Sequence, residues 1–242
     1  MDESDGQEPS CGNASRHGMF FLAPSEREAA SQLDNRHVAS AYARWAPVYD
    51  LAFAAVMRTG RRCLAAAANR HKGGRILDVG VGTGLELPML DPSLKIVGVD
   101  LSMPMLQRAA YRVRAAGLSG RVEGLTVMDA CRLGFVDAQF DAIVAPFVLT
   151  VLPEPEASLD EWRRVLKPGG EIILVNHIGA ERGVLAALEG WLGKRSAALG
   201  WRPEFPWTIL SDWLAARPEL ILTERRRLPP FGLFTLTRIK KP

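Results

Sequence analysis

A glycine-rich turn and three aspartates stand at spacings that suit the binding of a nucleotide-like ligand. The stretch 75–86 runs from a short apolar segment, which contains Asp78, into alternating glycines. Those glycines are Gly80, Gly82 and Gly84. Glycine has no Cβ and tolerates positive φ, so such a turn brings backbone close to a ligand. The dinucleotide fingerprint G-x-G-x-x-G would place its third glycine at position 85, which is Leu85, so the pattern is a different one.

Two further aspartates each follow an apolar segment. Asp100 ends the segment 94–100, and Asp129 follows the segment 122–128. A carboxylate has paired acceptors, so Asp100 could bind both hydroxyls of a ribose, and Asp129 could accept from an adenine amine. The residues that could enclose the adenine ring are Leu101 and Met105. A single aspartate at such a place is usually a helix cap or a solvated turn residue. Three in this order, after a glycine turn, favour an adenosyl ligand.

Apolar segments and helical stripes alternate along the chain and would position these residues. The expected strands are 76–79, 94–100, 122–128, 140–145, 171–175, 220–225 and 231–239. Helices are expected from Leu85 onward, after Ser102, over 159–166 and around 209–214. Such alternation predicts an α/β fold, a mostly parallel seven-stranded sheet with helices on both faces. Ligands of such sheets bind at the carboxyl ends of the strands.

The two regions outside this alternation have their own predicted roles. Residues 1–33 are polar and acidic and are expected to form a disordered tail before a domain at 34–242. Within that domain, 34–72 is predicted to form amphipathic, base-flanked helices. These helices could lie on a membrane, cover the pocket as a lid, or simply pack on the sheet. Segment 178–217 interrupts the strand pattern and is predicted to be a substrate-side, largely helical insertion before the sixth strand.

Composition limits the classes of function. The net charge is +3, but residues from 180 onward carry eleven bases and six acids. This imbalance suits an anionic partner, either a lipid surface or a nucleic acid. The run of arginines at 225–227 has no interleaved aromatic residue, so we expect no nucleic acid. No apolar run reaches the ~18 residues that span a bilayer. The three cysteines lack metal-ligand spacing, so a reduced, cytoplasmic protein without a bound metal is expected.

The motif at 78–84 resembles motif I of class I S-adenosylmethionine-dependent methyltransferases. Segment 42–50 is similar to the N-terminal segment of ubiquinone/menaquinone-type methyltransferases. Within that group the chain most resembles bacterial phospholipid N-methyltransferases of the Rhodobacter type. This closer resemblance lies in 78–84, 149–153, 176–177 and 199–205. It implies a Rossmann-like class I fold, and transfer of methyl groups from S-adenosylmethionine to phosphatidylethanolamine and its partly methylated forms, towards phosphatidylcholine.

The resemblance also assigns residues to roles. S-adenosylmethionine would be the cofactor and S-adenosylhomocysteine its product. The expected cofactor-binding residues are Tyr49, Asp78, Gly80, Gly82, Gly84, Asp100, Leu101, Met105, Met128, Asp129, Ala130 and Ala145. The expected catalytic residues are Tyr42, Tyr49, Asn176 and His177, and the expected substrate-binding residues are Arg202 and Trp207. Each of the acceptor-side residues could instead serve packing or a local ion pair.

The predicted setting is the inner face of a membrane. A peripherally attached monomer would take its phospholipid substrate from an anionic surface, to which each well-placed base adds roughly 1 kcal/mol. The alternatives are a ubiquinone/menaquinone-type C-methyltransferase or another small-molecule methyltransferase, an RNA-modifying protein, and a module that binds the cofactor without catalysis. All of them share the residues up to Asp129, so only the acceptor side separates them.

Overall fold

The computed structural model describes residues 57–177, 205–229, 232 and 234–242. The predicted tail at 1–33, most of the helices at 34–72 and most of the insertion at 178–217 lie outside the described residues. The same holds for three of the predicted site residues. These are Tyr42, Tyr49 and Arg202, and their roles stay predictions.

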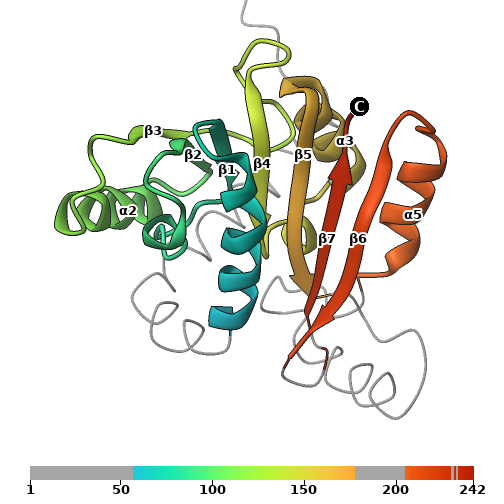
Figure 1. The fold of residues 1–242 in the computed structure, drawn as a ribbon, viewed down its shortest axis with the longest axis horizontal. Helices are drawn as coiled ribbons and strands as arrows, with labels where there is room; N and C mark the ends of the chain where they lie inside the picture. Colours follow the sequence, from blue (N-terminus) through green and yellow to red (C-terminus); the bar gives the residue numbers. More distant parts are fainter. Residues whose placement is uncertain (1–56, 178–204, 230–231, 233) are drawn as a thin grey trace, which may run out of the picture.

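A seven-stranded sheet forms the centre of the molecule (Figure 1), in the order β3-β2-β1-β4-β5-β7-β6. Its strands are β1 (Arg75–Val79), β2 (Lys95–Asp100), β3 (Val122–Val127), β4 (Phe140–Pro146), β5 (Leu166–His177), β6 (Ile221–Leu228) and β7 (Phe234–Lys240). The pairs from β3 to β5 are parallel, and β7 runs antiparallel to both of its neighbours. The prediction of a mostly parallel seven-stranded sheet is therefore confirmed.

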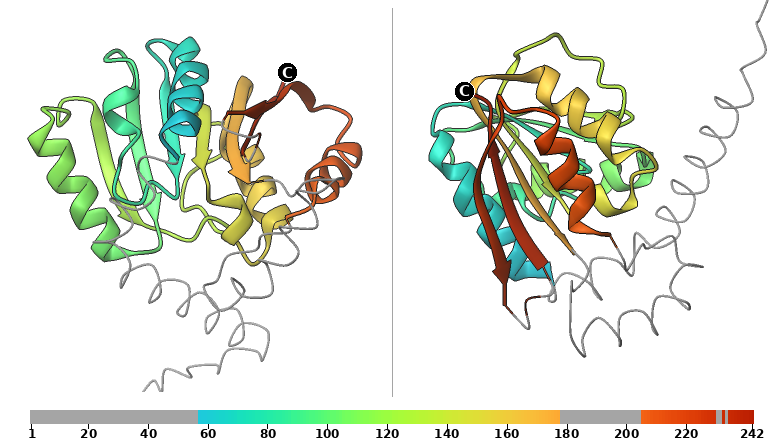
Figure 2. Two further views of the ribbon diagram at one scale, coloured as in Figure 1. Left: turned by 90° about the horizontal axis from the view of Figure 1, so that it is seen from below. Right: turned by 90° about the vertical axis from the view of Figure 1, so that its right-hand side faces the viewer.

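Helices cover both faces of the sheet, as predicted (Figure 2). One face carries α3 (Pro155–Val165) and α5 (Trp207–Ala215), which pack against Leu77 and Val79. The other face carries the helix that includes residues 57–68 and α2 (Met103–Ala115), which pack against Ile76 and Ile96. Successive residues of β1 thus point to opposite faces, as the strand period requires. Among the described residues, no helix combines the length and the apolar character needed to cross a membrane.

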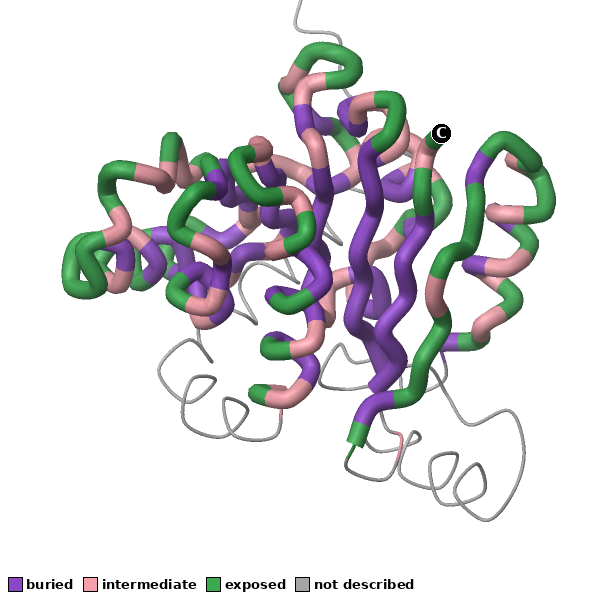
Figure 3. Tube along the Cα trace, viewed as in Figure 1, coloured by how far each residue is buried: buried purple, intermediate pink, exposed green. Residues whose placement is uncertain are grey.

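The buried residues are concentrated in the central strands (Figure 3). From Gly170 to His177, β5 is buried at every position because β4 and β7 cover its edges and helices cover its faces. The edge strand β6 is mostly exposed. Its charged side chains are typical of edges that must not pair with another chain. The carboxyl ends of the parallel strands are therefore held rigidly by a core that is continuous across the sheet.

Several local predictions needed correction. The chain after Leu85 forms only the short 3₁₀ turn η2 (Leu87–Met89) and no longer helix. Proline stands in the first turn of η2, and the chain must return at once to β2. Helix α3 begins at Pro155, four residues before the predicted 159, because a proline fits the first helical turn. Two 3₁₀ turns complete the described elements: η1 (Asn69–His71) and η3 (Leu149–Val151).

Candidate functional site

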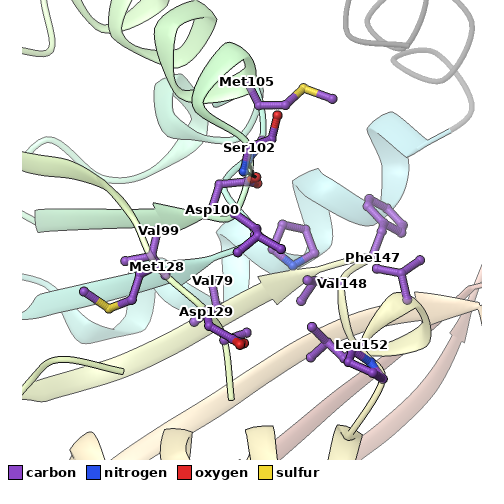
Figure 4. Close-up of a pocket in the computed structure, with 17 residues that line it drawn as sticks. Val79, Val99, Asp100, Ser102, Met105, Met128, Asp129, Phe147, Val148 and Leu152 are labelled. Carbon is purple, nitrogen blue, oxygen red and sulfur yellow. Dashed lines mark hydrogen bonds between the residues drawn. The ribbon is translucent and has the colours of Figure 1, made fainter. Parts of the chain in front are cut away.

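A pocket opens at the carboxyl ends of β1, β2 and β4, beside the glycine turn (Figure 4). Its walls come from four segments that are far apart in the sequence. The lining residues are Val79, Gly80, Gly82, Val99, Asp100, Leu101, Ser102, Met105, Met128, Asp129, Ala130, Pro146, Phe147, Val148, Val151, Leu152 and Pro153. Eight of the predicted cofactor-binding residues are among them. These are Gly80, Gly82, Asp100, Leu101, Met105, Met128, Asp129 and Ala130.

The three glycines of the turn have positive φ but serve different purposes. Gly80 has φ 69°, and a Cβ there would stand 2.6 Å from a methyl group of Val148. Gly84 has φ 71°, and its Cβ would stand 2.8 Å from Leu87. Gly82 has φ 53°, and the nearest atom to a Cβ would be the Gly80 carbonyl oxygen at 3.9 Å. Two glycines therefore allow close packing within the protein, whereas Gly82 leaves open space at the pocket wall.

Asp100 joins the glycine turn to the start of α2. Its Oδ2 accepts a hydrogen bond from the Gly82 N–H at 2.8 Å, and its Oδ1 accepts one from the Ser102 N–H at 2.8 Å. A carboxylate offers about four acceptor positions, so these bonds leave acceptor capacity for a ribose hydroxyl. Burial raises the pKa of Asp100 above its ordinary value, although the N–H donors of Ser102, Gly82 and Leu101 oppose this.

Asp129 lies at the end of β3, on a turn that the core holds in place. Its Oδ1 accepts a hydrogen bond from the Cys131 N–H at 2.9 Å. The next carbonyl, that of Ala130, accepts from the Trp162 indole N–H at 3.1 Å. The Met128 N–H donates to the Asp100 carbonyl at 3.1 Å, which ties the ends of β2 and β3 together. Two acidic side chains on neighbouring strands thus face one pocket, as the sequence predicted.

Asp78 lies elsewhere. Its side chain is fully buried and does not line the pocket, and no N–H or hydroxyl group of the described residues donates to its oxygens. Burial raises its pKa well above the ordinary 3.8, and the neighbouring Glu86 and Asp100 charges raise it further. Glu86 is buried as well, and its Oε2 lies 3.5 Å from the Nε of Arg61. The predicted contact of Asp78 with the cofactor stays a prediction, and the geometry favours an indirect role.

The loop after β4 supplies a wall that the sequence interpretation missed. Phe147 lines this wall and has φ 62°, which is uncommon for a bulky side chain. Its N–H donates to the Val175 carbonyl at 2.7 Å, so β5 holds it in this conformation. The guanidinium carbon of Arg61 lies 5.3 Å from the centre of its ring. The sequence held one clue to the role of Phe147, which is its position. Pro146 and Phe147 stand at the carboxyl end of a buried strand, where ligands of such sheets bind.

Asn176 and His177 end β5, as predicted, but they do not lie together at the pocket. Both are buried, and neither lines it. Neighbouring residues of a strand point to opposite faces. The His177 ring packs edge-on against Phe234, with 6.4 Å between ring centres, on the face opposite Asn176. The Oδ1 of Asn176 has no hydrogen-bond partner among the described residues. Their catalytic roles stay predictions.

The two remaining predicted residues do not line the pocket. Ala145 is fully buried in the core. It directly precedes Pro146, which lines the pocket. Trp207 begins α5, packs on the core, and carries the guanidinium of Arg225 at 3.8 Å from its ring centre. The aromatic contact that the run of arginines lacks in sequence is therefore supplied from another element.

The fold agrees with comparisons to known proteins. A methyltransferase domain family matches residues 77–174. A putative methyltransferase structure from Bacillus halodurans superimposes with TM-score 0.63 at 18% identity, covering 75% of this chain and 98% of that one. The structure of a geranyl diphosphate methyltransferase in complex with S-adenosylmethionine gives TM-score 0.61 at 16% identity, over 75% of this chain and 85% of that one. These likenesses establish the Rossmann-like methyltransferase fold.

Sequence relatives are more specific. The phosphatidylethanolamine N-methyltransferase of Cereibacter sphaeroides is 41% identical over 204 residues, which cover 84% of this chain and 97% of that protein. A demethylmenaquinone methyltransferase of Deinococcus radiodurans is 37% identical over 154 residues, and the chain spans 63% of its length. The chain is therefore an S-adenosylmethionine-dependent methyltransferase of class I. Within that class it belongs to the family that includes the Cereibacter sphaeroides enzyme.

The residues of the pocket suit this cofactor. Gly82 leaves room for a ligand against backbone, and Asp100 keeps acceptor capacity after binding two N–H groups. The remaining walls are mainly apolar, as an adenosyl group requires. Among the described residues, no cluster of three or more His, Cys, Asp or Glu side chains could hold a metal ion.

Proposed function

We propose that this protein methylates the amine of phosphatidylethanolamine and of its partly methylated forms, towards phosphatidylcholine. The observation that carries the proposal is the 41% identity over 97% of the Cereibacter sphaeroides phosphatidylethanolamine N-methyltransferase. That similarity extends well beyond the cofactor-binding domain at 77–174, so it includes the segments on the acceptor side. Bound S-adenosylmethionine supplies an electrophilic methyl group on a sulfonium.

The protein's own contribution would be to hold and orient the acceptor. An amine attacks only when neutral, and most of the acceleration would come from holding it in line with the methyl group. We assign orientation of the amine to Tyr42 and Tyr49, whose rings could also stabilise the developing methylammonium. Asn176 and His177 would act from the end of β5. The apolar wall that includes Phe147 and Val148 would keep water out of the reacting centre.

Residues outside the pocket would bind the lipid phosphate and the membrane surface. Arg202 is proposed to bind the lipid phosphate, since a guanidinium can do so with two parallel hydrogen bonds. Trp207 would lie beside the headgroup, where an amphipathic ring is favoured. The base-flanked segment 34–72 and the basic C-terminal quarter would attach the protein peripherally to the cytoplasmic face of an anionic membrane, as a monomer.

The second candidate is quinone C-methylation, which the 37% identity to the Deinococcus radiodurans enzyme favours. That similarity covers 61% of this chain, against 84% for the phospholipid enzyme. A quinone precursor is a planar phenol that is methylated on carbon, so it needs no site for a cationic product. The two candidates therefore differ in acceptor chemistry and can be separated by one comparison of products.

The decisive experiment expresses the chain in cells that lack phosphatidylcholine and analyses their lipids by mass spectrometry. Mono-, di- or trimethylated phosphatidylethanolamine is expected. Asp100→Ala is the matched control, because it removes the carboxylate that holds Gly82 and would abolish cofactor binding. Purified protein is then given phosphatidylethanolamine vesicles and a demethylated quinone precursor in parallel. Methylation of the quinone alone would overturn the proposal.

A further inference from the structure

Beneath the glycine turn lies a buried group of charged side chains that the proposed reaction does not use. The group consists of Asp78, Glu86 and Arg61, and we call Asp78 and Glu86 the acid pair. Their exposed fractions are 0%, 2% and 4%. Arg61 comes from the helix that includes residues 57–68, Asp78 from β1, and Glu86 from the end of the turn. Two carboxyl groups and one guanidinium group thus share one buried site.

The three charges do not balance. The Nε of Arg61 lies 3.5 Å from Oε2 of Glu86, which pairs one acid with the arginine. Among the described residues, no N–H or hydroxyl group donates to either oxygen of Asp78 or to Oε1 of Glu86. The hydrogen-bonding partner left to Asp78 is the Glu86 carboxyl group. A buried carboxylate without a partner is unfavourable by several kcal/mol, and such a group takes up a proton instead. The geometry therefore favours one shared proton on the acid pair.

The other charges around the pair come from two elements. Asp100, at the end of β2, raises the pKa of Asp78 by its negative charge. Arg112 of α2 acts in the opposite direction on Glu86, and its guanidinium also donates to the Thr83 carbonyl within the turn. Burial is the largest cause of the raised pKa of both acids. Within the described part of the chain, Arg61, Arg112 and Asp100 are thus the charged groups named as acting on the pair.

The pair is coupled to the pocket through the turn itself. Asp78 stands two residues before Gly80, and Glu86 stands four residues after Gly82, whose N–H is bound to Asp100. A positive charge in the pocket would favour the ionised form of the pair, because an opposite charge stabilises a carboxylate and buried charges are screened less than exposed ones. It would offset the unfavourable negative charge that a second ionised carboxylate brings to this site.

We propose that Asp78 and Glu86 hold one proton between them in the free protein and release it when the cationic cofactor occupies the pocket. The O–H bond of the protonated carboxyl group breaks, the electron pair stays on the carboxylate, and the solvent buffer accepts the proton. The second negative charge would then offset part of the positive charge that the sulfonium brings to the pocket. This proposal goes beyond the choice of acceptor and holds for either a lipid or a quinone substrate.

The test measures proton release during cofactor binding. Isothermal titration calorimetry of S-adenosylmethionine binding, at one neutral pH in buffers of different ionisation enthalpy, gives the number of protons released. The wild-type protein should release close to one, and Asp78→Asn should release almost none. S-adenosylhomocysteine has the same amino and carboxyl groups but no sulfonium, so it should release clearly less. Asp137→Asn, an exposed carboxyl group paired with Arg164, is the control and should match the wild type.

Every result decides the matter. No release by the wild type would overturn the proposal. Unchanged release by Asp78→Asn would also overturn it, since the proton would then come from Asp100 or from the ligand amine. If Asp78→Asn does not fold, Glu86→Gln replaces it. Arg61 would then pair with Asp78 and keep it ionised, so release should fall. Equal release with both ligands would equally contradict the proposal. None of these measurements uses a methyl acceptor, so they stand apart from the lipid test.

Discussion

At the scale of residues, similar side chains in one motif have different physical duties. Gly80, Gly82 and Gly84 all have positive φ, yet only Gly82 has open space where a Cβ would be. Asp78 of the motif and Asp100 at the end of the next strand were both predicted to bind the cofactor, yet only Asp100 lines the pocket. The difference comes from the strand period, because it directs Asp78 to the face of the helix that includes residues 57–68.

This contrast predicts different failures for two glycine variants. In Gly82→Ala the strained φ costs about 1–2 kcal/mol, and the added methyl group enters the open space at the pocket wall. In Gly84→Ala the same strain is joined by a contact of 2.8 Å with Leu87 and 3.3 Å with Ala109. We expect Gly82→Ala to lose more cofactor affinity and Gly84→Ala to lose more thermal stability. Calorimetry with each variant checks this, and the reverse order would contradict it.

At the scale of elements, the strands at the C-terminal side are joined by buried ion pairs. Arg238 of β7 donates to both oxygens of Glu171 on β5, at 2.7 and 2.8 Å, and lies 3.3 Å from Glu224 on β6. The Arg238 and Glu171 side chains are only 11% and 9% exposed. These contacts fix the antiparallel strand β7 between β5 and β6 in the first half of β5, while Asn176 and His177 at the other end of β5 pair with Thr235 and Phe234 of β7.

Loss of Arg238 should therefore be costly. Arg238→Met leaves Glu171 buried without its main partner, and the free energy of unfolding should fall by about 3–5 kcal/mol. Arg226→Met on β6 removes a partly exposed ion pair with Glu224. This variant should change the free energy of unfolding by less than about 1 kcal/mol. Urea unfolding of both variants makes the comparison. A restoring effect of Glu171→Leu in the Arg238→Met background would confirm that the uncompensated charge causes the loss.

At the scale of the whole molecule, the buried acid pair connects stability to pH. The folded state raises the pKa of Asp78 well above 3.8, so between these values the native protein binds more protons than the unfolded chain. Stability from this group is complete below the unfolded pKa and is lost as pH rises through the folded pKa. Other carboxyl groups act oppositely. Those with a lowered pKa include Asp141, Glu161 and Glu224.

The contribution of Asp78 is isolated by a difference between proteins. Asp78→Asn keeps the shape of the side chain but cannot ionise. Its stability relative to the wild type should therefore increase as pH rises from 4 towards neutral. Denaturant unfolding across that range, without cofactor, measures the difference at each pH. A constant difference would show that Asp78 ionises alike in the folded and unfolded chains.

The sequence by itself determined which segments form the strands and which residues meet at the pocket beside the glycine turn. Short apolar segments, a glycine turn and strand-end aspartates are local signals, and each depends on only a few neighbouring residues. They predicted the strands, the helix that follows Ser102, and eight of the residues that line the pocket. The sequence predicted a longer helix after Leu85 and not the short turn η2. The chain must lead back to β2 within a few residues, and this constraint from the fold outweighs the local helical pattern.

Only the tertiary structure decided which residues meet across the sheet. It placed Phe147 in the pocket wall, separated Asn176 from His177, and gave Asp78 two buried charged neighbours in Glu86 and Arg61. None of these contacts follows from spacing, because each joins elements that lie far apart in sequence or depends on the face to which a strand residue points. Burial and charge balance are properties of the packed molecule, so the proton that we assign to the acid pair becomes visible only there.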